Sequence, residues 1–361
     1  MDEEEIVLRR MRNTGLSGPP SKDWQDVVRR FGAMQAQDYG PAKWSLGQRS
    51  GGINDQDIDR ALEEGSILRT HLLRPTWHFV LPEDIRWLLE LTRPRVHAAN
   101  AHAYRQIGMD EQLTRRSNKL IGGALQGGNQ LTRKELQRVL GKGGVETDSR
   151  RLSFLMMYAE LEGVIASGGR KGKQHTYALL EERAPDAKEL SPDDALAELT
   201  LRYFTAHGPA TVNDFRWWSS LKVSDIKRGL HLVGSKLKKE VIDGRSYWFS
   251  GTVPRSRPKS PVVHLLQAYD EYIVGYSDTK HLLNLSGIAR KLTDRTLYLG
   301  VVMLDGQIAG HWKRTLSKSS VRFDVALYRA IKGGPAVALQ RAADEYGAFL
   351  DLPAEVAPTR L

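Results

Sequence analysis

Three stretches of the chain share one pattern. In each, short segments with one apolar face are followed by two extended segments, and the second of these contains aromatic residues. Apolar residues at helical spacing predict helices at 24–34 and 55–63, then at 132–140 and 151–161, and finally at 193–206, 212–217 and 224–239. Each series turns extended at 62–67, 160–165 or 237–242 and returns through strands at 76–80, 177–180 or 246–249. Helices followed by a hairpin, three times, predict three tandem winged-helix units.

The hairpins of the second and third units have different turns. The second contains a glycine-rich, basic stretch from Gly168 to Lys173, which we expect at the hairpin tip, where it would contact nucleic acid. The third contains Asp243-Gly244, a pair typical of a tight two-residue turn. We expect Trp77 and Trp248, on the first and third return strands, to be core residues.

The last hundred residues change character and predict a β-rich domain. Strands are expected at 297–304, 307–313 and 321–327, the first two joined by Asp305-Gly306, and a helix at 335–350. Proline-containing linkers are expected at 181–191 and 250–261. The sequence thus predicts an α+β chain with winged-helix units at 1–100, 101–184 and 192–250, and a small β-barrel-like domain at 262–361.

Composition narrows the classes of protein. The chain has no cysteine, which excludes disulfides, thiolate zinc sites, iron–sulfur clusters and cysteine nucleophiles. No stretch approaches the ~18 apolar residues of a membrane span, and the acidic N-terminus is unlike a signal peptide. The formal net charge of +10 is typical of a polyanion-binding protein, although many basic proteins bind no nucleic acid. We expect a cytoplasmic, nucleoid-associated protein.

Basic residues gather where winged helices contact DNA. They lie on a predicted helix, on the second wing and in the third unit, at Arg133, Lys134, Arg170, Lys171, Lys173 and Lys236. Phosphate contacts of this kind determine affinity and its salt dependence. The alternative for any single cluster is a solvated charged face. The predicted helix at 151–161 is mostly apolar, so a repressor that reads bases is not favoured.

Common catalytic motifs are absent from the sequence, and one short segment stands out. There is no Gly-x-Ser-x-Gly elbow, His-Glu-x-x-His motif or Walker loop, and we expect neither a metal nor a cofactor. In the segment from Ala33 to Pro41 we expect a helix to end, because a proline disfavours helical geometry in the residue before it. Gln35 and Gln37 would diverge by roughly 200° in a continuing helix, so they converge only if the chain unwinds between them. The alternative is that both are polar residues of a frayed last turn.

At this segment the sequence resembles the AlkZ/YcaQ-like family of winged-helix DNA glycosylases, whose hallmark is Gln-hydrophobe-Gln or Gln-hydrophobe-Asp. Gln35-Ala36-Gln37 matches the first form. The likeness continues, in matching order, through residues 73–79, 207–211 with 214–215 and 218–219, and 270–272 with 275–276 and 278.

The resemblance implies three winged helices and a small β-barrel around a concave DNA channel, and cleavage of the N-glycosidic bond of bulky or crosslinking alkylpurines in duplex DNA. Gln35 and Gln37 would position the hydrolytic water in a monofunctional enzyme, with Asp38 as a possible accessory carboxylate. Lys313 and Arg314 would approach the DNA, and the protein would be a monomer. The alternatives are a non-catalytic DNA-binding protein or transcriptional regulator and, less favoured, an RNA-binding protein.

Overall fold

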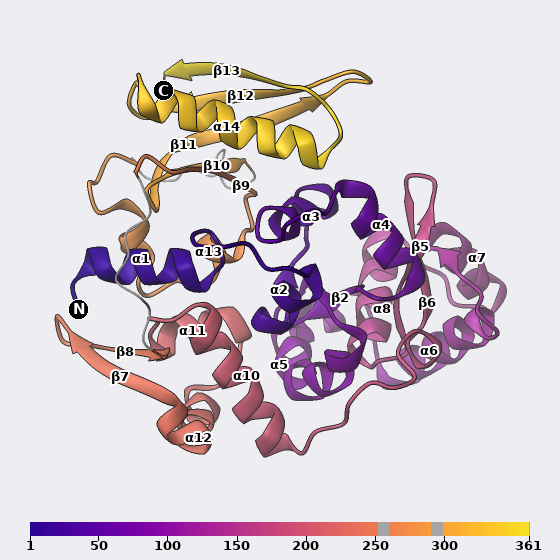
Figure 1. Ribbon diagram of the computed structural model, residues 1–361. Coiled ribbons are helices and arrows are strands. Elements are labelled where there is room, and N and C mark those ends of the chain that lie inside the picture. Colours follow the sequence, from indigo (N-terminus) through magenta and orange to yellow (C-terminus); the bar gives the residue numbers. More distant parts are fainter. Residues whose placement is uncertain (252–259, 290–298, 361) are drawn as a thin grey trace.

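The computed structural model describes residues 1–251, 260–289 and 299–360, and it is a mixed α+β structure (Figure 1). The first repeat is formed by α2 (Trp24–Phe31), β1 (Met34–Gln35), α3 (Tyr39–Gly47), α4 (Asp55–Glu64), β2 (Leu68–Leu72) and β3 (Thr76–Val80). The second repeats that order in α6 (Glu111–Leu125), β4 (Leu131–Thr132), α7 (Arg133–Lys142), α8 (Ser149–Leu161), β5 (Ile165–Lys171) and β6 (Gln174–Leu179). Their sheets have equivalent strand orders, β1-β3-β2 and β4-β6-β5, and all pairs are antiparallel.

The third repeat is formed by α10 (Pro192–Ala206), α11 (Val212–Ser219), α12 (Val223–Val233), β7 (Leu237–Ile242) and β8 (Arg245–Ser250). Its first strand is reduced to one bridge between Ala210 and Trp248. The order of helix, short strand, two helices and hairpin therefore occurs three times. Asp243 and Gly244 have φ angles of 47° and 75°, the left-handed geometry that the two-residue turn was predicted to need.

Element boundaries differ from the prediction where packing decides them. The helix expected at 24–34 ends at Phe31, because Gly32 adopts a φ of 79° and the next residues pair with β3. The helix expected at 224–239 ends at Val233, and residues 237–242 form a strand. Trp77 and Trp248 are only half-buried, so the expectation that both are core residues was wrong.

The C-terminal part is an open sheet covered by one helix. Strands β9 (Val263–Leu266), β10 (Gly300–Leu304), β11 (Gln307–Leu316), β12 (Val321–Leu327) and β13 (Ala354–Arg360) have the order β13-β12-β11-β10-β9, and β13 is parallel to β12. Helix α14 (Gly334–Phe349), predicted at 335–350, packs on this sheet. The described strands do not close into a barrel, so that expectation was wrong. The segments 252–259 and 290–298 lie outside the described residues; the first is part of the expected linker, and the second includes the first two residues, 297–298, of the expected first strand.

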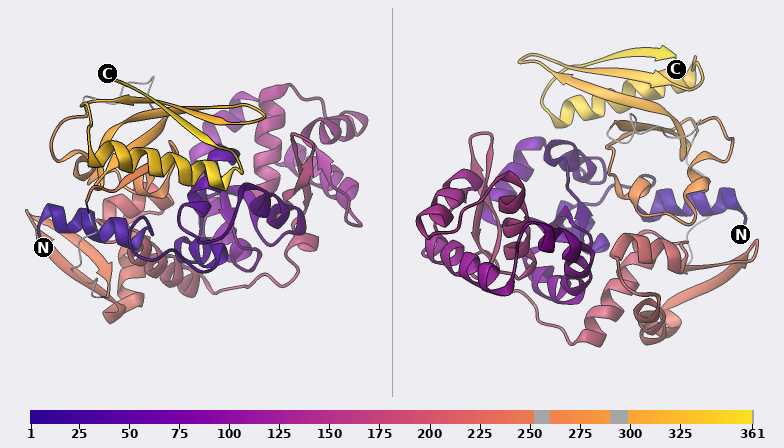
Figure 2. Two further views of the ribbon diagram at one scale, coloured as in Figure 1. Left: turned by 45° about the horizontal axis from the view of Figure 1, so that its top comes forward. Right: turned by 180° about the vertical axis from the view of Figure 1, so that it is seen from behind.

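The remaining helices join the repeats. Helix α1 (Glu3–Asn13) packs with its Ile6 and Val7 against Tyr247 of β8, and α5 (Ile85–Gln106) packs against the third repeat. Short helices are η1 (Pro82–Asp84), α9 (Leu180–Arg183), η2 (Gly234–Lys236), α13 (Glu271–Val274) and η3 (Lys280–Asn284). Figure 2 shows α1 between the third repeat and the C-terminal sheet. No helix in the described ranges is long and apolar enough to cross a membrane.

Candidate active site

The Gln-Ala-Gln segment begins in a short strand. Met34 and Gln35 form β1, where Gln35 lies opposite His78, and the Ala36 N–H donates to the carbonyl of Trp77 at 2.7 Å. The expectation of a helix terminus was therefore wrong. Gln37 follows β1 in a bend before α3, so the chain between the two glutamines is not helical.

Donors from the protein fix both glutamine amides. Arg74 donates to Gln35 Oε1 at 2.6 Å, and the backbone N–H of Trp77 donates to Gln37 Oε1 at 3.3 Å. A guanidinium and a backbone N–H can only donate, so each amide must turn its carbonyl oxygen toward them. Both side chains are therefore left with their NH₂ groups for a ligand. Neither amide can take a proton from water.

Glu271 holds the backbone of the motif from the far end of the chain. Its Oε1 accepts the Gln35 N–H at 2.7 Å, and its Oε2 accepts from Trp218 Nε1 at 2.8 Å and lies 3.0 Å from His207 Nε2. The carboxylate is 1% exposed. Burial alone would raise the pKa of Glu271, but the contacts with His207 and the Gln35 N–H outweigh burial and lower the pKa to about 2.

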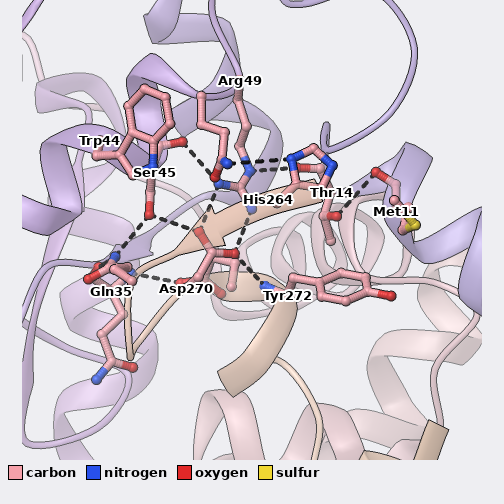
Figure 3. A network of polar contacts seen from close by, with 12 residues as sticks. Met11, Thr14, Gln35, Trp44, Ser45, Arg49, His264, Asp270 and Tyr272 are labelled. Carbon is pink, nitrogen blue, oxygen red and sulfur yellow. Dashed lines mark hydrogen bonds and ion pairs between the residues drawn. The ribbon is translucent and has the colours of Figure 1, made fainter. Parts of the chain in front are cut away.

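A buried ion pair connects the C-terminal part to the segment that follows α3, beside Glu271 (Figure 3). Arg49 makes two hydrogen bonds to Asp270, of 2.7 and 2.9 Å, and the side chains are 1% and 0% exposed. Ser45 also donates to Asp270, at 2.8 Å, and Gln267 Nε2 donates to the carbonyl of Gln35 at 3.3 Å. The Gln35 side chain points away from this network in Figure 3, so the network holds the backbone of the motif and does not contact the side-chain amide.

His78 is the side chain opposite Gln35 on the neighbouring strand. Burial, together with the positive charge of Arg74, lowers the pKa of His78 to about 3. Its Nδ1 lies 2.9 Å from the carbonyl of Thr76. A histidine with this pKa is neutral at physiological pH, so it donates Nδ1–H to that carbonyl and does not serve as an acid there.

Asp38 borders a cavity between the motif and the C-terminal sheet. The cavity has a volume of about 220 Å³, and Gln267, Lys313 and Arg314 also line it. Asp38 is the N-cap residue of α3 but makes no side-chain capping hydrogen bond, so its carboxylate is not used by the helix. Desolvation raises the pKa of Asp38, and the charges of Arg314 and Arg69 oppose the shift.

Lys313 and Arg314, from β11, lie at this cavity together with Asp38, and their contact with DNA stays a prediction. Arg314 donates to the Tyr346 hydroxyl at 2.6 Å. A Cβ added to Gly40 would lie 2.7 Å from Arg314 Nη2, so a larger residue there would push the end of this side chain aside. Lys313 is exposed.

The second wing is tied to the protein more closely than its sequence suggests. Gly168 and Gly169 lie within β5, at an irregularity in its pairing with β6, and the turn is formed by Gly172 and Lys173. Arg170 folds back to Asp59 of α4 at 3.4 Å, and Lys171 pairs with Glu135 of α7 at 2.9 Å. Of the expected tip, Gly172 and Lys173 do form the exposed turn, whereas Gly168 to Arg170 are a packed part of β5.

The other basic residues predicted to bind DNA lie on two separate parts of the molecule. Lys134, at the start of α7, and Lys173 are exposed. Arg133 is half-buried and donates to Ser153 Oγ at 2.6 Å. Lys236 is exposed between α12 and β7 in the third repeat.

A family model described as DNA glycosylase AlkZ-like matches residues 28–349. The chain therefore belongs to the AlkZ-like DNA glycosylase family, and the resemblance seen in the sequence is confirmed. The interstrand DNA cross-link repair glycosylase of Streptomyces sahachiroi is 24% identical over 331 residues, 86% of this chain and 87% of that protein. The solved structure of Streptomyces sahachiroi DNA glycosylase AlkZ has a TM-score of 0.78 at 21% identity, covering 99% of this chain and 100% of that one. This likeness shows a shared fold.

Arg74, Glu271 and Trp218 are functional residues that the sequence alone did not reveal, although all three lie in segments that carry the family resemblance. The sequence feature that could have identified Arg74 and Glu271 is a charged residue beside apolar or aromatic neighbours, as in Leu73-Arg74-Pro75 and Asp270-Glu271-Tyr272. Charged groups are rarely buried unless paired, so such positions are candidates for a buried network.

Replacing Glu271 with glutamine should destabilise the fold and loosen Gln35. Whichever way the new amide turns, its NH₂ group meets an N–H donor, that of Gln35 or that of Trp218. The pKa of Glu271 is depressed in the folded protein, so the carboxylate stabilises the fold fully above the unfolded pKa of roughly 4.5, and this stability is lost as pH falls toward about 2. The difference in melting temperature between the wild type and Glu271→Gln should therefore be constant near pH 7 and should become smaller below pH 4.5. The exposed Glu189→Gln is the control, and an unchanged gap at low pH would contradict the assignment.

Proposed function

We propose that the protein is a monofunctional DNA glycosylase that uses water to hydrolyse the N-glycosidic bond of N-alkylated purines in duplex DNA, bulky or crosslinking adducts included. The observation that carries this proposal is the pair Gln35 and Gln37, two residues apart, with both side-chain carbonyl oxygens occupied by donors from the protein. Membership of the AlkZ-like family supports it, as does the relative named an interstrand DNA cross-link repair glycosylase.

Two neutral amides suit this chemistry. An N7- or N3-alkylated purine carries a positive charge and leaves readily, so positioning and electrostatic help can supply the remaining reduction of the barrier. The two NH₂ groups would hold the oxygen of the attacking water or an acceptor atom of the nucleotide near C1′. An unmodified purine lacks this positive charge, and a neutral amide does not protonate it, so it should be a poor substrate.

We expect Asp38 to accept the proton of the attacking water. Its carboxylate follows Gln37 in the chain, borders the cavity and is free of capping. A base acts only when deprotonated, so excision should fall as pH drops through the pKa of Asp38, which is raised above the ordinary value. Single-turnover rates of Asp38→Asn should be lower and should lose this acid limb. If the pH profile of Asp38→Asn is unaltered, Asp38 has only a structural role at the start of helix α3.

DNA binding is proposed to involve the three repeats as winged-helix units around a concave channel, in a monomer that needs no metal. Affinity should fall steeply with salt, because neutralising ~5 to 8 phosphates gives a log–log slope near −0.9 per contact. Titrations of duplex DNA between 50 and 200 mM salt, with and without EDTA, measure this slope. A slope near zero would contradict the proposed channel.

The decisive experiment is incubation of the protein with duplex DNA bearing N7-alkylguanine, N3-alkyladenine or an interstrand crosslink, followed by detection of abasic sites under single-turnover conditions. Release of the alkylated base is the expected result. No release from any of the three would refute the glycosylase and leave the second candidate, a winged-helix protein that binds DNA without catalysis. That candidate is favoured by the basic charge alone.

A further inference from the structure

Helix α11 carries two adjacent tryptophans in opposite environments. Trp218 is 0% exposed and donates its Nε1–H to Glu271, the residue that holds the Gln35 backbone. Trp217 is 51% exposed and is the one aromatic among the large apolar side chains exposed in the described part of the chain. An exposed indole is unusual because its burial is favourable. Its exposure here therefore suggests that a binding partner covers it.

A single side chain, Arg74, connects Trp217 to the glutamine motif. The guanidinium carbon of Arg74 is 6.0 Å from the centroid of the Trp217 ring, and Arg74 holds Gln35 Oε1 at 2.6 Å. The Nε atom of Arg74 is buried and has no hydrogen-bond partner among the described residues. The exposed indole therefore borders the place where the proposed substrate meets Gln35.

The rest of this helix face suits nucleic acid. Asn213 and Arg216 are also exposed, and they precede Trp217 by four residues and by one, so Asn213 shares a face with both. No ion pair to Arg216 is found within the described ranges. A free guanidinium fits a phosphate, and an aromatic ring fits the face of a base whatever its sequence.

We propose that Trp217 stacks on a nucleobase next to the lesion, in the space that opens when the damaged nucleotide leaves the helix. This inference rests on the proposed function. When a nucleotide is extruded, the neighbouring base pair loses a stacking partner. An indole can replace that partner whatever the neighbouring base is. Arg74, beneath the ring, links the stacked position to Gln35.

Binding to two duplexes of the same sequence tests this proposal. One is undamaged, and the other has a tetrahydrofuran abasic analogue, which leaves an unstacked gap and has no glycosidic bond to cleave. Trp217→Ala should weaken binding to the gapped duplex by ~5- to 100-fold, the range measured for loss of one base–aromatic stack, and should leave the undamaged duplex within ~2-fold. Trp217→Phe should retain most of the affinity. Val241→Ala, which removes a 61% exposed side chain of the same repeat, is the matched control.

The intrinsic fluorescence gives a second reading. Wild-type protein should show quenching on the gapped duplex that is missing in Trp217→Phe. Equal weakening of both duplexes by Trp217→Ala, or none, would overturn the proposal. Because the gapped duplex needs no catalysis, tight Trp217-dependent binding by a protein that excises nothing would refute the glycosylase and keep the stacking site.

Discussion

Gln35→Ala and Gln37→Ala should each slow excision of a cationic alkylpurine by ~10²-fold, because each removes one positioned electrostatic contact from the reacting nucleotide or its water. DNA affinity should change little in either variant. The melting temperature should change little in Gln37→Ala, whereas Gln35→Ala also removes the acceptor of the buried Arg74 and should lower it. The Gln37 amide takes part in one weak hydrogen bond of 3.3 Å, and the network that holds the motif acts on the backbone of Gln35. Single-turnover rates on duplex DNA with N7-alkylguanine measure the effect.

Two further variants separate positioning from proton transfer. Gln37→Glu and Gln37→Asp supply a carboxylate, which can act as a base and should broaden excision toward less activated purines. Gln48→Ala, at a glutamine of the same repeat outside the motif, is the control. If Gln35→Ala and Gln37→Ala both excise at the wild-type rate, the motif is only part of the fold.

Arg49→Ala should lower the free energy of unfolding by ~3 to 5 kcal/mol, the cost of leaving a buried charge without its partner. Asp270 is 0% exposed and receives two hydrogen bonds from Arg49, of 2.7 and 2.9 Å, so water cannot replace the guanidinium. Urea denaturation followed by circular dichroism measures the loss. Excision should fall too, since Glu271, which holds Gln35, is the next residue in the chain.

The matched control is Arg228→Ala, which breaks an exposed pair with Asp193 of nearly the same length, 2.7 Å. Surface pairs contribute ~0 to 1 kcal/mol, so this variant should unfold almost like wild type. Similar losses in the two variants would mean that the Arg49–Asp270 pair is not buried in solution.

Local rules were enough for much of the fold. The two Asp-Gly turns follow from the left-handed φ angles that such turns require, 47° and 75° at Asp243 and Gly244 and 49° and 80° at Asp305 and Gly306. The helix predicted at 335–350 is observed at Gly334–Phe349, because a proline near its start and a continuous apolar face are both local features. The glutamine pair and the family also came from the sequence alone.

Tertiary contacts decided the geometry of the site. Residues 34–35 are a strand because β3 pairs with them, and Glu271, which holds Gln35, is 236 residues away in the chain. The second wing has a basic, glycine-rich sequence, yet Asp59 and Glu135 engage Arg170 and Lys171. The sequence determined which residues could turn, cap a helix or carry the chemistry, because those properties depend on near neighbours. The orientation of the two amides depends on donors brought from other strands, and only packing of the whole chain could decide it.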